Sequence, residues 1–247
     1  MGLEYDGSRF LGWQTQPGGG TVQDAVQAAL AQIAGHDIAL TGAGRTDRGV
    51  HARGQVAHFD TDAARPQSAW VRGVNAFLPD SIAVLWSAEV APDFHARYSA
   101  RSRTYRYELL NRPVRPALEA GRVGWFHAPL DVGAMREAAA PLLGEHDFSA
   151  FRAAECQART PVRRIDAIDI AREGERIHFV VRANAFLHHM VRNIVGALVY
   201  VGCGRQPASW TAELLASRDR RRAAPTFGAE GLYLEKVDYD AAWGLPQ

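Results

Sequence analysis

The chain has 247 residues, which is enough for one large domain or for two modest domains that each bury a core. Hydrophobic residues make up 47% of the chain and charged residues 22%, a balance that excludes an intrinsically disordered protein. The formal net charge is +1, yet arginines gather at residues 97–115 and 218–222. Such clusters are common as solvated surface, but arginine also pairs well with phosphate.

The sequence carries no signal for a membrane or for secretion. No apolar run approaches the roughly 18 residues of a membrane span, and residues 1–10 lack the basic-then-apolar pattern of a secretion signal. Cys156 and Cys203 are far apart without CxxC spacing, which argues against a disulfide framework and against a zinc site. We therefore expect a cytoplasmic protein with no membrane association.

Residues 1–97 are predicted to form a first α+β domain. The expected elements are, in chain order, a strand at 2–5, a helix at 21–35, strands at 37–43 and 53–61, a helix at 66–80 and a strand at 82–90. Thr21 and Asp24 have the spacing of a capping box at the start of the first helix. This order of elements is typical of the split β-α-β arrangement in ferredoxin-like folds.

Residues 98–247 are predicted to form a second α+β domain. Its expected elements are a strand at 104–111, a helix at 131–143 interrupted near Pro141, a hairpin of strands at 162–171 and 176–184, a helix at 186–202 and a strand at 231–239. Alternation puts Tyr105 and Tyr107 on one face of the first strand. On the second helix, His188, His189 and Arg192 are expected to share one side. The predicted fold class is therefore α+β, with two ferredoxin-like units and extended antiparallel sheets.

A single aspartate, Asp47, lies in a predicted loop that is rich in glycine and arginine. The loop fails as a dinucleotide-binding GxGxxG sequence because Asp47 occupies the third glycine position, and no Walker Gly-Lys-Ser/Thr follows. No HExxH or base-deaminase ligand pattern occurs, so no metal is expected. Arg45 and Arg48 are expected to keep the carboxylate ionised, which suits a nucleophile or an electrostatic partner for an oxocarbenium-like sugar. The alternative is an aspartate that hydrogen-bonds its own turn.

The stretch GRTDRGVHA, residues 44–52, resembles the active-site motif GRTDxGVHA of the tRNA pseudouridine synthase A family. Five further stretches occur in the family's order and approximate spacing: YDGSRFLGWQ (5–14), TVQDAV (21–26), SARSRTYRY (99–107), FLHHMVRNIVG (186–196) and GLYL (231–234). Together they span nearly the whole chain. The sequence departs from the family at Phe227–Gly228–Ala229, where Ala–Pro–Ala is usual, and in having fewer residues before EYDG.

The resemblance implies roles for five residues. Asp47 matches the catalytic aspartate, which acts on a flipped uridine, and Tyr105 matches the tyrosine that lies against the target base. Arg192 matches an arginine that pairs with the catalytic carboxylate, and Arg45 matches one that helps to position the extruded nucleotide. Leu232 matches an apolar residue that lines the uracil pocket. The residues alone are also compatible with core roles for Tyr105 and Leu232, and with a solvated helix face for Arg192.

The resemblance implies a pseudouridine synthase fold with a central RNA-binding cleft. It also implies a cofactor-free isomerase, acting as a homodimer, that converts uridine to pseudouridine at positions 38–40 in the anticodon stem-loop of tRNA. Asp47 would either attack the nucleotide or assist elimination through a glycal, and no DNA partner is expected. One alternative is a catalytically silent RNA-binding protein on the same scaffold, which would have no reason to keep Asp47, Tyr105 and Arg192 together. Another is a nucleoside hydrolase, which would require a second carboxylate that no motif supplies.

Overall fold

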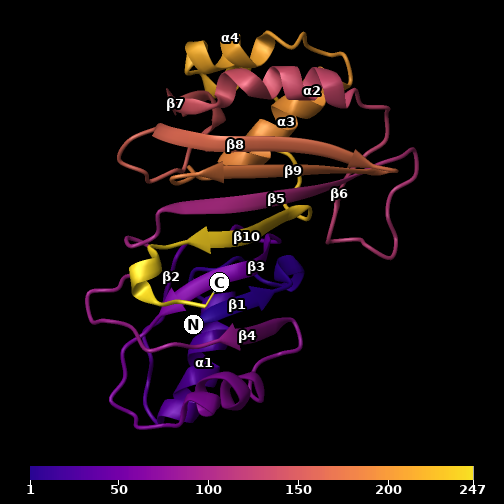
Figure 1. Ribbon diagram of the computed structural model, residues 1–247. Helices are drawn as coiled ribbons and strands as arrows, with labels where there is room; N and C mark the ends of the chain where they lie inside the picture. The colour runs from indigo at the N-terminus through magenta and orange to yellow at the C-terminus, as the bar shows by residue number, and fades with distance from the viewer. Residues whose placement is uncertain (247) are drawn as a thin grey trace. The chain divides into compact units, whose positions relative to one another are not determined.

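A computed structural model describes residues 1–246 of the chain (Figure 1). The chain forms two compact units. Unit 1 comprises Met1–Arg101 together with the segment from Tyr233 onward, and unit 2 comprises Ser102–Leu232. The predicted boundary between the two domains follows residue 97, with the last strand in the second domain. In the structure the C-terminal segment packs with unit 1 instead, which makes unit 1 discontinuous in sequence.

Unit 1 contains a mixed sheet in the order β4-β1-β3, with β2 and β10 both paired to β3. The strands are β1 (Gly2–Tyr5), β2 (Thr41–Gly42), β3 (His51–His58), β4 (Ile82–Trp86) and β10 (Leu232–Asp238). β1 runs antiparallel to β3 and β4, and β2 runs antiparallel to β3, whereas β10 runs parallel to β3. The order β4-β1-β3-β2 agrees with the ferredoxin-like arrangement predicted for the first half of the chain.

The predicted first helix of unit 1 is confirmed as α1 (Val22–Ala34). Thr21 and Asp24 form the expected capping box at its start, and Gly35, with φ of +82°, ends it. The second predicted helix is a π-helical segment, η2 (Ala69–Gly73), and two 3₁₀ segments complete the unit, η1 (Gly7–Arg9) and η6 (Ala241–Trp243). Unit 1 thus keeps the predicted order of elements with a shorter second helix.

The strand predicted at residues 37–43 is wrong for most of its length, because only β2 forms there. Side chains of α1 bind the backbone that a strand neighbour would otherwise bind. Gln23 donates to the Leu40 carbonyl over 2.7 Å, and the Leu40 amide donates to Gln27 over 3.1 Å. The buried Leu40 therefore sits in a loop whose backbone polar groups are satisfied by a helix.

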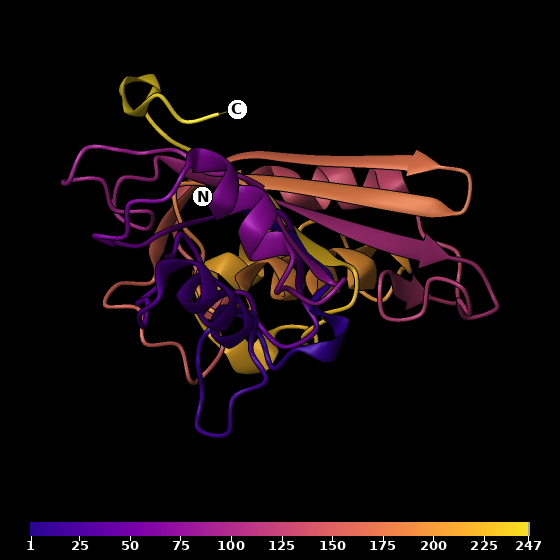
Figure 2. The ribbon, with the colours of Figure 1, turned by 90° about the horizontal axis from the view of Figure 1, so that it is seen from below.

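Unit 2 contains a sheet in the order β5-β9-β8-β7, in which successive strands are antiparallel, and β6 pairs parallel to β5. The strands are β5 (Ser102–Asn111), β6 (Gly124–Phe126), β7 (Gly144–Asp147), β8 (Val162–Glu173) and β9 (Arg176–Ala183). The predicted hairpin is confirmed as β8 and β9, which extend side by side in Figures 1 and 2. On the other side of β9, cross-strand pairs with β5 join Tyr105 to Val181 and Tyr107 to Phe179, and all four side chains are buried.

The helices of unit 2 are α2 (Val132–Ala139), α3 (Met190–Gly202) and α4 (Trp210–Ser217), with 3₁₀ segments η3 (Ala140–Leu142), η4 (Ser149–Phe151) and η5 (Arg220–Arg222). α2 gives way to η3 at Pro141, as expected. α3, which runs behind β8 and β9 in Figure 1, begins later than predicted because His189 adopts a left-handed conformation with φ of +62°. His188 and His189 therefore precede the helix, and their predicted place on its face beside Arg192 is wrong.

The helices between residues 1 and 246 are short. The two longest, α1 and α3, have 13 residues each. Within that range no helix is long and apolar enough to cross a membrane.

Candidate active site

Asp47 lies in the loop between β2 and β3 of unit 1. The chain turns directly after it: the Val50 amide donates to the Asp47 carbonyl over 3.1 Å, and Gly49 has φ of +77°, which glycine tolerates without strain. This turn is closed by main-chain atoms, so the hydrogen bond that forms it does not use the Asp47 carboxylate. Asp47 is half-buried, whereas Arg45 and Arg48 are exposed. The loop presents a partly shielded carboxylate flanked in sequence by two solvent-facing guanidinium groups.

Buried side chains hold the residues that precede Asp47. The Tyr5 and Thr46 hydroxyls lie 2.8 Å apart, and Gln55 donates to the Gly44 carbonyl over 2.8 Å. Tyr5 and Gln55 are almost completely buried, and burial raises the pKa of Tyr5 to about 12. The tyrosine therefore remains a neutral hydrogen-bonding group at any physiological pH. The role of Gln55 is not predictable from the sequence, because a lone glutamine in a strand gives no signal of it.

Two glycines of the YDGSRFLGWQ stretch allow backbone to pack against this loop. The Trp13 amide donates to the Thr46 carbonyl over 3.0 Å. Gly12 has φ of +101°, and a Cβ atom there would lie 2.7 Å from the same carbonyl oxygen. A Cβ atom on Gly7 would lie 1.9 Å from the Val50 carbonyl oxygen. Only glycine fits at either position, so this stretch and the Asp47 loop form one close-packed support.

Tyr105 lies on β5 of unit 2 and is buried. Its ring meets the ring of Phe186 edge to face, with centroids 5.1 Å apart. Tyr107, two residues on, is fully buried and donates its hydroxyl to the Gly228 carbonyl over 2.9 Å. Burial, with a further contribution from the Glu230 carboxylate, holds the pKa of Tyr107 well above its ordinary value. Tyr107 thus has the core position expected for it, and Tyr105 shares that face of the strand.

Arg192 lies in the first turn of α3 and is half-buried. Its Nε donates to the Phe227 carbonyl over 2.9 Å, while the Phe227 amide donates to the Arg192 carbonyl at 3.3 Å. The guanidinium is therefore oriented by main chain from a distant part of the sequence. Leu232, the first residue of β10, is buried, and its amide donates to the Ala229 carbonyl over 2.9 Å.

The five predicted site residues fall on both units. Asp47 and Arg45 share one loop of unit 1, and Tyr105 and Arg192 lie on β5 and α3 of unit 2. Leu232 is the last residue of unit 2, at the point where β10 begins. Within each unit, packing and hydrogen bonds fix the backbone that carries them. The roles of these residues stay predictions.

Arginines of the first cluster, at residues 97–115, are partly committed to contacts with the protein itself. Carboxylates pair with Arg101 (Asp240), Arg106 (Glu108) and Arg112 (Glu175). Glu108 is buried and also lies 2.6 Å from the His178 ring, so the Arg106 contact belongs to a buried polar cluster. Several positive charges at residues 97–115 are therefore balanced by carboxylates of the protein itself.

The second cluster, at residues 218–222, divides in the same way. Arg218 Nε lies 3.4 Å from Asp147 Oδ2, and a terminal guanidinium nitrogen of Arg221 lies 2.8 Å from Asp219 Oδ2. Arg220 turns inward and donates to the Ala224 carbonyl over 2.8 Å. The run of arginines thus has two different uses: Arg218 and Arg221 pair with carboxylates, and Arg220 binds main chain.

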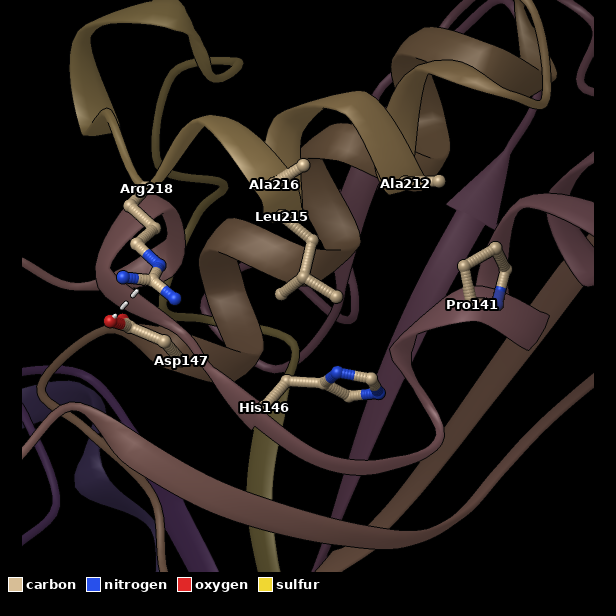
Figure 3. A pocket seen from close by; sticks show the side chains of 7 residues that line it. All are labelled: Pro141, His146, Asp147, Ala212, Leu215, Ala216 and Arg218. Carbon is tan, nitrogen blue, oxygen red and sulfur yellow. Dashed lines mark ion pairs between the residues drawn. The ribbon is translucent and has the colours of Figure 1, made fainter.

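A pocket of about 540 Å³ lies on unit 2 between α4 and the η3–β7 segment (Figure 3). It is lined by Pro141, His146, Asp147, Ala212, Leu215, Ala216 and Arg218. The Asp147–Arg218 ion pair closes one side, as the dashed line in Figure 3 marks. None of the five predicted site residues lines this pocket, so it is separate from the predicted site chemistry.

Comparison with known proteins gives one consistent family. A family model described as tRNA pseudouridine synthase matches residues 3–99 and 138–240, which include Asp47, Arg192 and Leu232. Proteins named tRNA pseudouridine synthase A from Methylobacillus flagellatus, Dechloromonas aromatica and Burkholderia multivorans are each 58% identical over 246 residues. These alignments cover 100% of the present chain and 94%, 94% and 91% of the respective relatives.

Among solved structures, a chain in a crystal structure of a Cbf5-Nop10-Gar1 complex aligns with 81% of the present chain and 45% of its own length. Its sequence identity is 13% and its TM-score 0.39, a likeness too weak to carry an argument. The assignment depends on the sequence relatives, which match at high identity from end to end. The chain therefore belongs to the tRNA pseudouridine synthase A family of isomerases.

Proposed function

We propose that this protein converts uridine to pseudouridine at positions 38–40 in the anticodon stem-loop of tRNA, with Asp47 as the catalytic carboxylate. The observation that carries the proposal is the support of the Asp47 loop. Buried hydrogen bonds from Tyr5 and Gln55 and a main-chain contact from Trp13 fix the residues before Asp47. A surface turn would not require three separate supports, whereas a carboxylate that must meet one atom of a substrate would.

The reaction is an isomerisation whose atoms balance without a further reactant. The bond from N1 of the base to C1′ of the sugar breaks, the base rotates, and a bond from C5 to C1′ forms. The proton lost from C5 is balanced by the proton gained at N1. Asp47 takes part either as a nucleophile or by assisting elimination through a glycal. No metal or cofactor is required by this chemistry.

The remaining residues act on the extruded nucleotide in this proposal. Tyr105 lies against the target base, Leu232 lines the uracil pocket, and Arg45 helps to position the nucleotide. Arg192 pairs with the Asp47 carboxylate. The support for these roles is the residue-by-residue resemblance together with the 58% identity to the named relatives. Extruding a uridine from its stack costs a few kcal/mol, which contacts between arginines and phosphates can offset.

The tRNA is proposed to bind a homodimer of this chain in the cytoplasm. The support for dimerisation is family resemblance, and the support for binding along the phosphate backbone is the exposed arginines at residues 218–222. Analytical ultracentrifugation of the purified protein with and without tRNA tests the stoichiometry. A monomer that turns over at the full rate would contradict the dimer.

The decisive test of the function is the change Asp47→Asn, which keeps the size of the side chain and removes its negative charge. We expect single-turnover pseudouridine formation in unmodified tRNA transcripts to fall by about a thousandfold or more. The affinity for tRNA should be unchanged or slightly higher, since one negative charge near phosphate is gone. Mapping pseudouridine along the transcript shows whether positions 38–40 are the ones modified.

The matched control is Asp37→Asn, which makes the same chemical change at an exposed position of unit 1. It should turn over like the parent protein. A rate for Asp47→Asn within tenfold of the parent would show that Asp47 is only a turn residue, because asparagine serves in turns as well as aspartate does. Modification confined to other positions would leave the catalytic role intact and overturn the proposed target site.

A further inference from the structure

Arg220 differs from the other arginines at residues 218–222 because its guanidinium is used inside unit 2. It donates to the Ala224 carbonyl over 2.8 Å, and to Asn193 Oδ1 and Thr226 Oγ1 over 3.0 Å each. Arg221, the next residue, has a side chain that is 90% exposed. Arg220 is therefore a structural cross-link between α3 and the segment 224–227.

Asn193 forms the centre of this cross-link. It is fully buried in α3, and its amide nitrogen donates to the Phe151 carbonyl over 2.8 Å. That bond fixes which way the amide points, so its oxygen faces Arg220 and Thr226. The Thr226 hydroxyl donates to this oxygen over 2.7 Å. All three side chains are thus held in one orientation.

The cross-link lies directly beside Arg192. Phe227, which follows Thr226, accepts a hydrogen bond from Arg192 Nε over 2.9 Å and donates its amide to the Arg192 carbonyl at 3.3 Å. On the same helix, a Cβ atom at Gly196 would lie 2.6 Å from the Pro225 carbonyl oxygen. Segment 224–227 therefore packs closely on α3, with the carbonyl groups of Pro225 and Phe227 facing the helix.

We infer that Arg220, Asn193 and Thr226 form a clamp that positions the Arg192 guanidinium through the Phe227 carbonyl. The inference depends on the proposed function, in which Arg192 acts on the Asp47 carboxylate. An arginine side chain has several rotatable bonds, so fixing it in one geometry costs conformational entropy. If the side chain is already fixed before the substrate binds, the reaction step does not include this entropy cost. The three clamp residues are positioning residues.

The change Thr226→Val tests the clamp because it removes the hydroxyl and nearly keeps the shape, and Thr226→Ser restores the hydroxyl. We expect Thr226→Val to lower the single-turnover rate at saturating tRNA by about tenfold, since small misplacements of catalytic groups cost up to about a hundredfold. The dissociation constant for tRNA should change by less than about twofold. Thr226→Ser should turn over within about twofold of the parent.

A second variant, Arg220→Lys, keeps the positive charge and loses the forked geometry that reaches three acceptors. A clamp predicts a slower rate with unchanged tRNA affinity. If Arg220 instead binds a phosphate, Arg220→Lys should turn over like the parent at saturating tRNA. This variant also keeps the inference testable if Thr226→Val unfolds near the assay temperature, which a thermal melt will show.

A double-mutant cycle separates positioning of Arg192 from a general effect on the fold. In an Arg192→Gln background, Thr226→Val should have no further effect on the rate. An equal tenfold loss in both backgrounds would overturn the inference, because the hydroxyl would then act independently of Arg192. If Arg192→Gln is slow but Thr226→Val and Arg220→Lys both match the parent, the clamp is wrong and the proposed function stands. A parent-like rate for Arg192→Gln would contradict both.

Discussion

The Tyr5 hydroxyl lies 2.8 Å from the Thr46 hydroxyl, one residue before Asp47. Tyr5 is on β1 and Thr46 is on the loop ahead of β3, so this contact joins the first strand of unit 1 to the candidate catalytic loop. Both residues are buried, and the hydrogen bond is shielded from water. The stability of the unit and the geometry of the loop are therefore linked through one phenol.

The first prediction is that Tyr5 makes unit 1 sensitive to alkali. Its pKa is about 12 in the folded protein and about 10 in an unfolded chain, so the folded state holds this proton more tightly. Stability from this group is then fully present below pH 10 and is lost as the pH rises through 12. By pH 11 the loss amounts to about 1.4 kcal/mol of the free energy of unfolding.

Urea unfolding of the parent and of Tyr5→Phe at pH 8 and pH 11 measures this loss. The variant should be less stable by about 1 kcal/mol at pH 8, because it lacks the hydrogen bond, and should lose less stability between the two pH values. Equal losses in the two proteins would show that Tyr5 is not the titrating group.

The second prediction concerns Gly12→Ala, which places a methyl group 2.7 Å from the Thr46 carbonyl oxygen at a φ of +101°. The loop before Asp47 has to move, so we expect a slower single-turnover rate and a loss of roughly 1–3 kcal/mol in stability. Gly18→Ala is the matched control, since Gly18 has φ of +96° but no atom of residues 1–246 within 4 Å of its Cβ position. The difference between the two variants isolates the steric contact from the backbone strain. Equal rates and equal stabilities for Gly12→Ala and Gly18→Ala would mean that the loop moves away from the added methyl group without loss of free energy.

The third prediction is that tRNA affinity falls steeply with salt. About four phosphate contacts imply a slope near −3 for log affinity against log salt, because each contact contributes roughly 0.7 to 0.9. Arg222 is exposed, so Arg222→Gln should remove one phosphate contact and make the slope shallower by roughly 0.7 to 0.9. Arg220→Gln should leave the slope unchanged, since the guanidinium of Arg220 is bonded inside the fold. Fluorescence anisotropy titrations of tRNA at several salt concentrations measure the slope for each variant. A shallower slope for Arg220→Gln than for the parent would show that Arg220 contacts phosphate.

Elements with local signals were predictable from the sequence. The Thr21–Asp24 capping box marks the start of α1, and alternation identifies the buried face of β5 that carries Tyr105. The start of α3 could not be predicted, because apolar periodicity continues through residues 186–189 and nothing local shows that His189 takes a left-handed conformation. Apolar periodicity does not indicate the backbone conformation of a single residue, so it extends the predicted helix past its true start.

The parts of the candidate site that were predictable are those named by short motifs, above all Asp47 and its neighbours. Supporting residues were not predictable, since they act through contacts over long sequence separations. From the sequence alone, Gln55 is indistinguishable from any polar strand residue, and Arg220 is indistinguishable from its solvent-exposed arginine neighbours. Their roles become visible only when the partner carbonyl or amide is known. Leu40 shows the same limit for the fold, because helix side chains bind its backbone.

The discontinuity of unit 1 affects the order in which a newly made chain can fold. β3, which follows the Asp47 loop, pairs with β10 through Tyr233 and Leu234, and these residues leave the ribosome only after all of unit 2 has been made. Domains usually fold from the N-terminus as they emerge. Here the uninterrupted unit 2 can form its internal contacts while β3 still lacks this partner. Translation itself thus delays completion of the sheet beside the Asp47 loop, so a half-made chain is not expected to act on RNA.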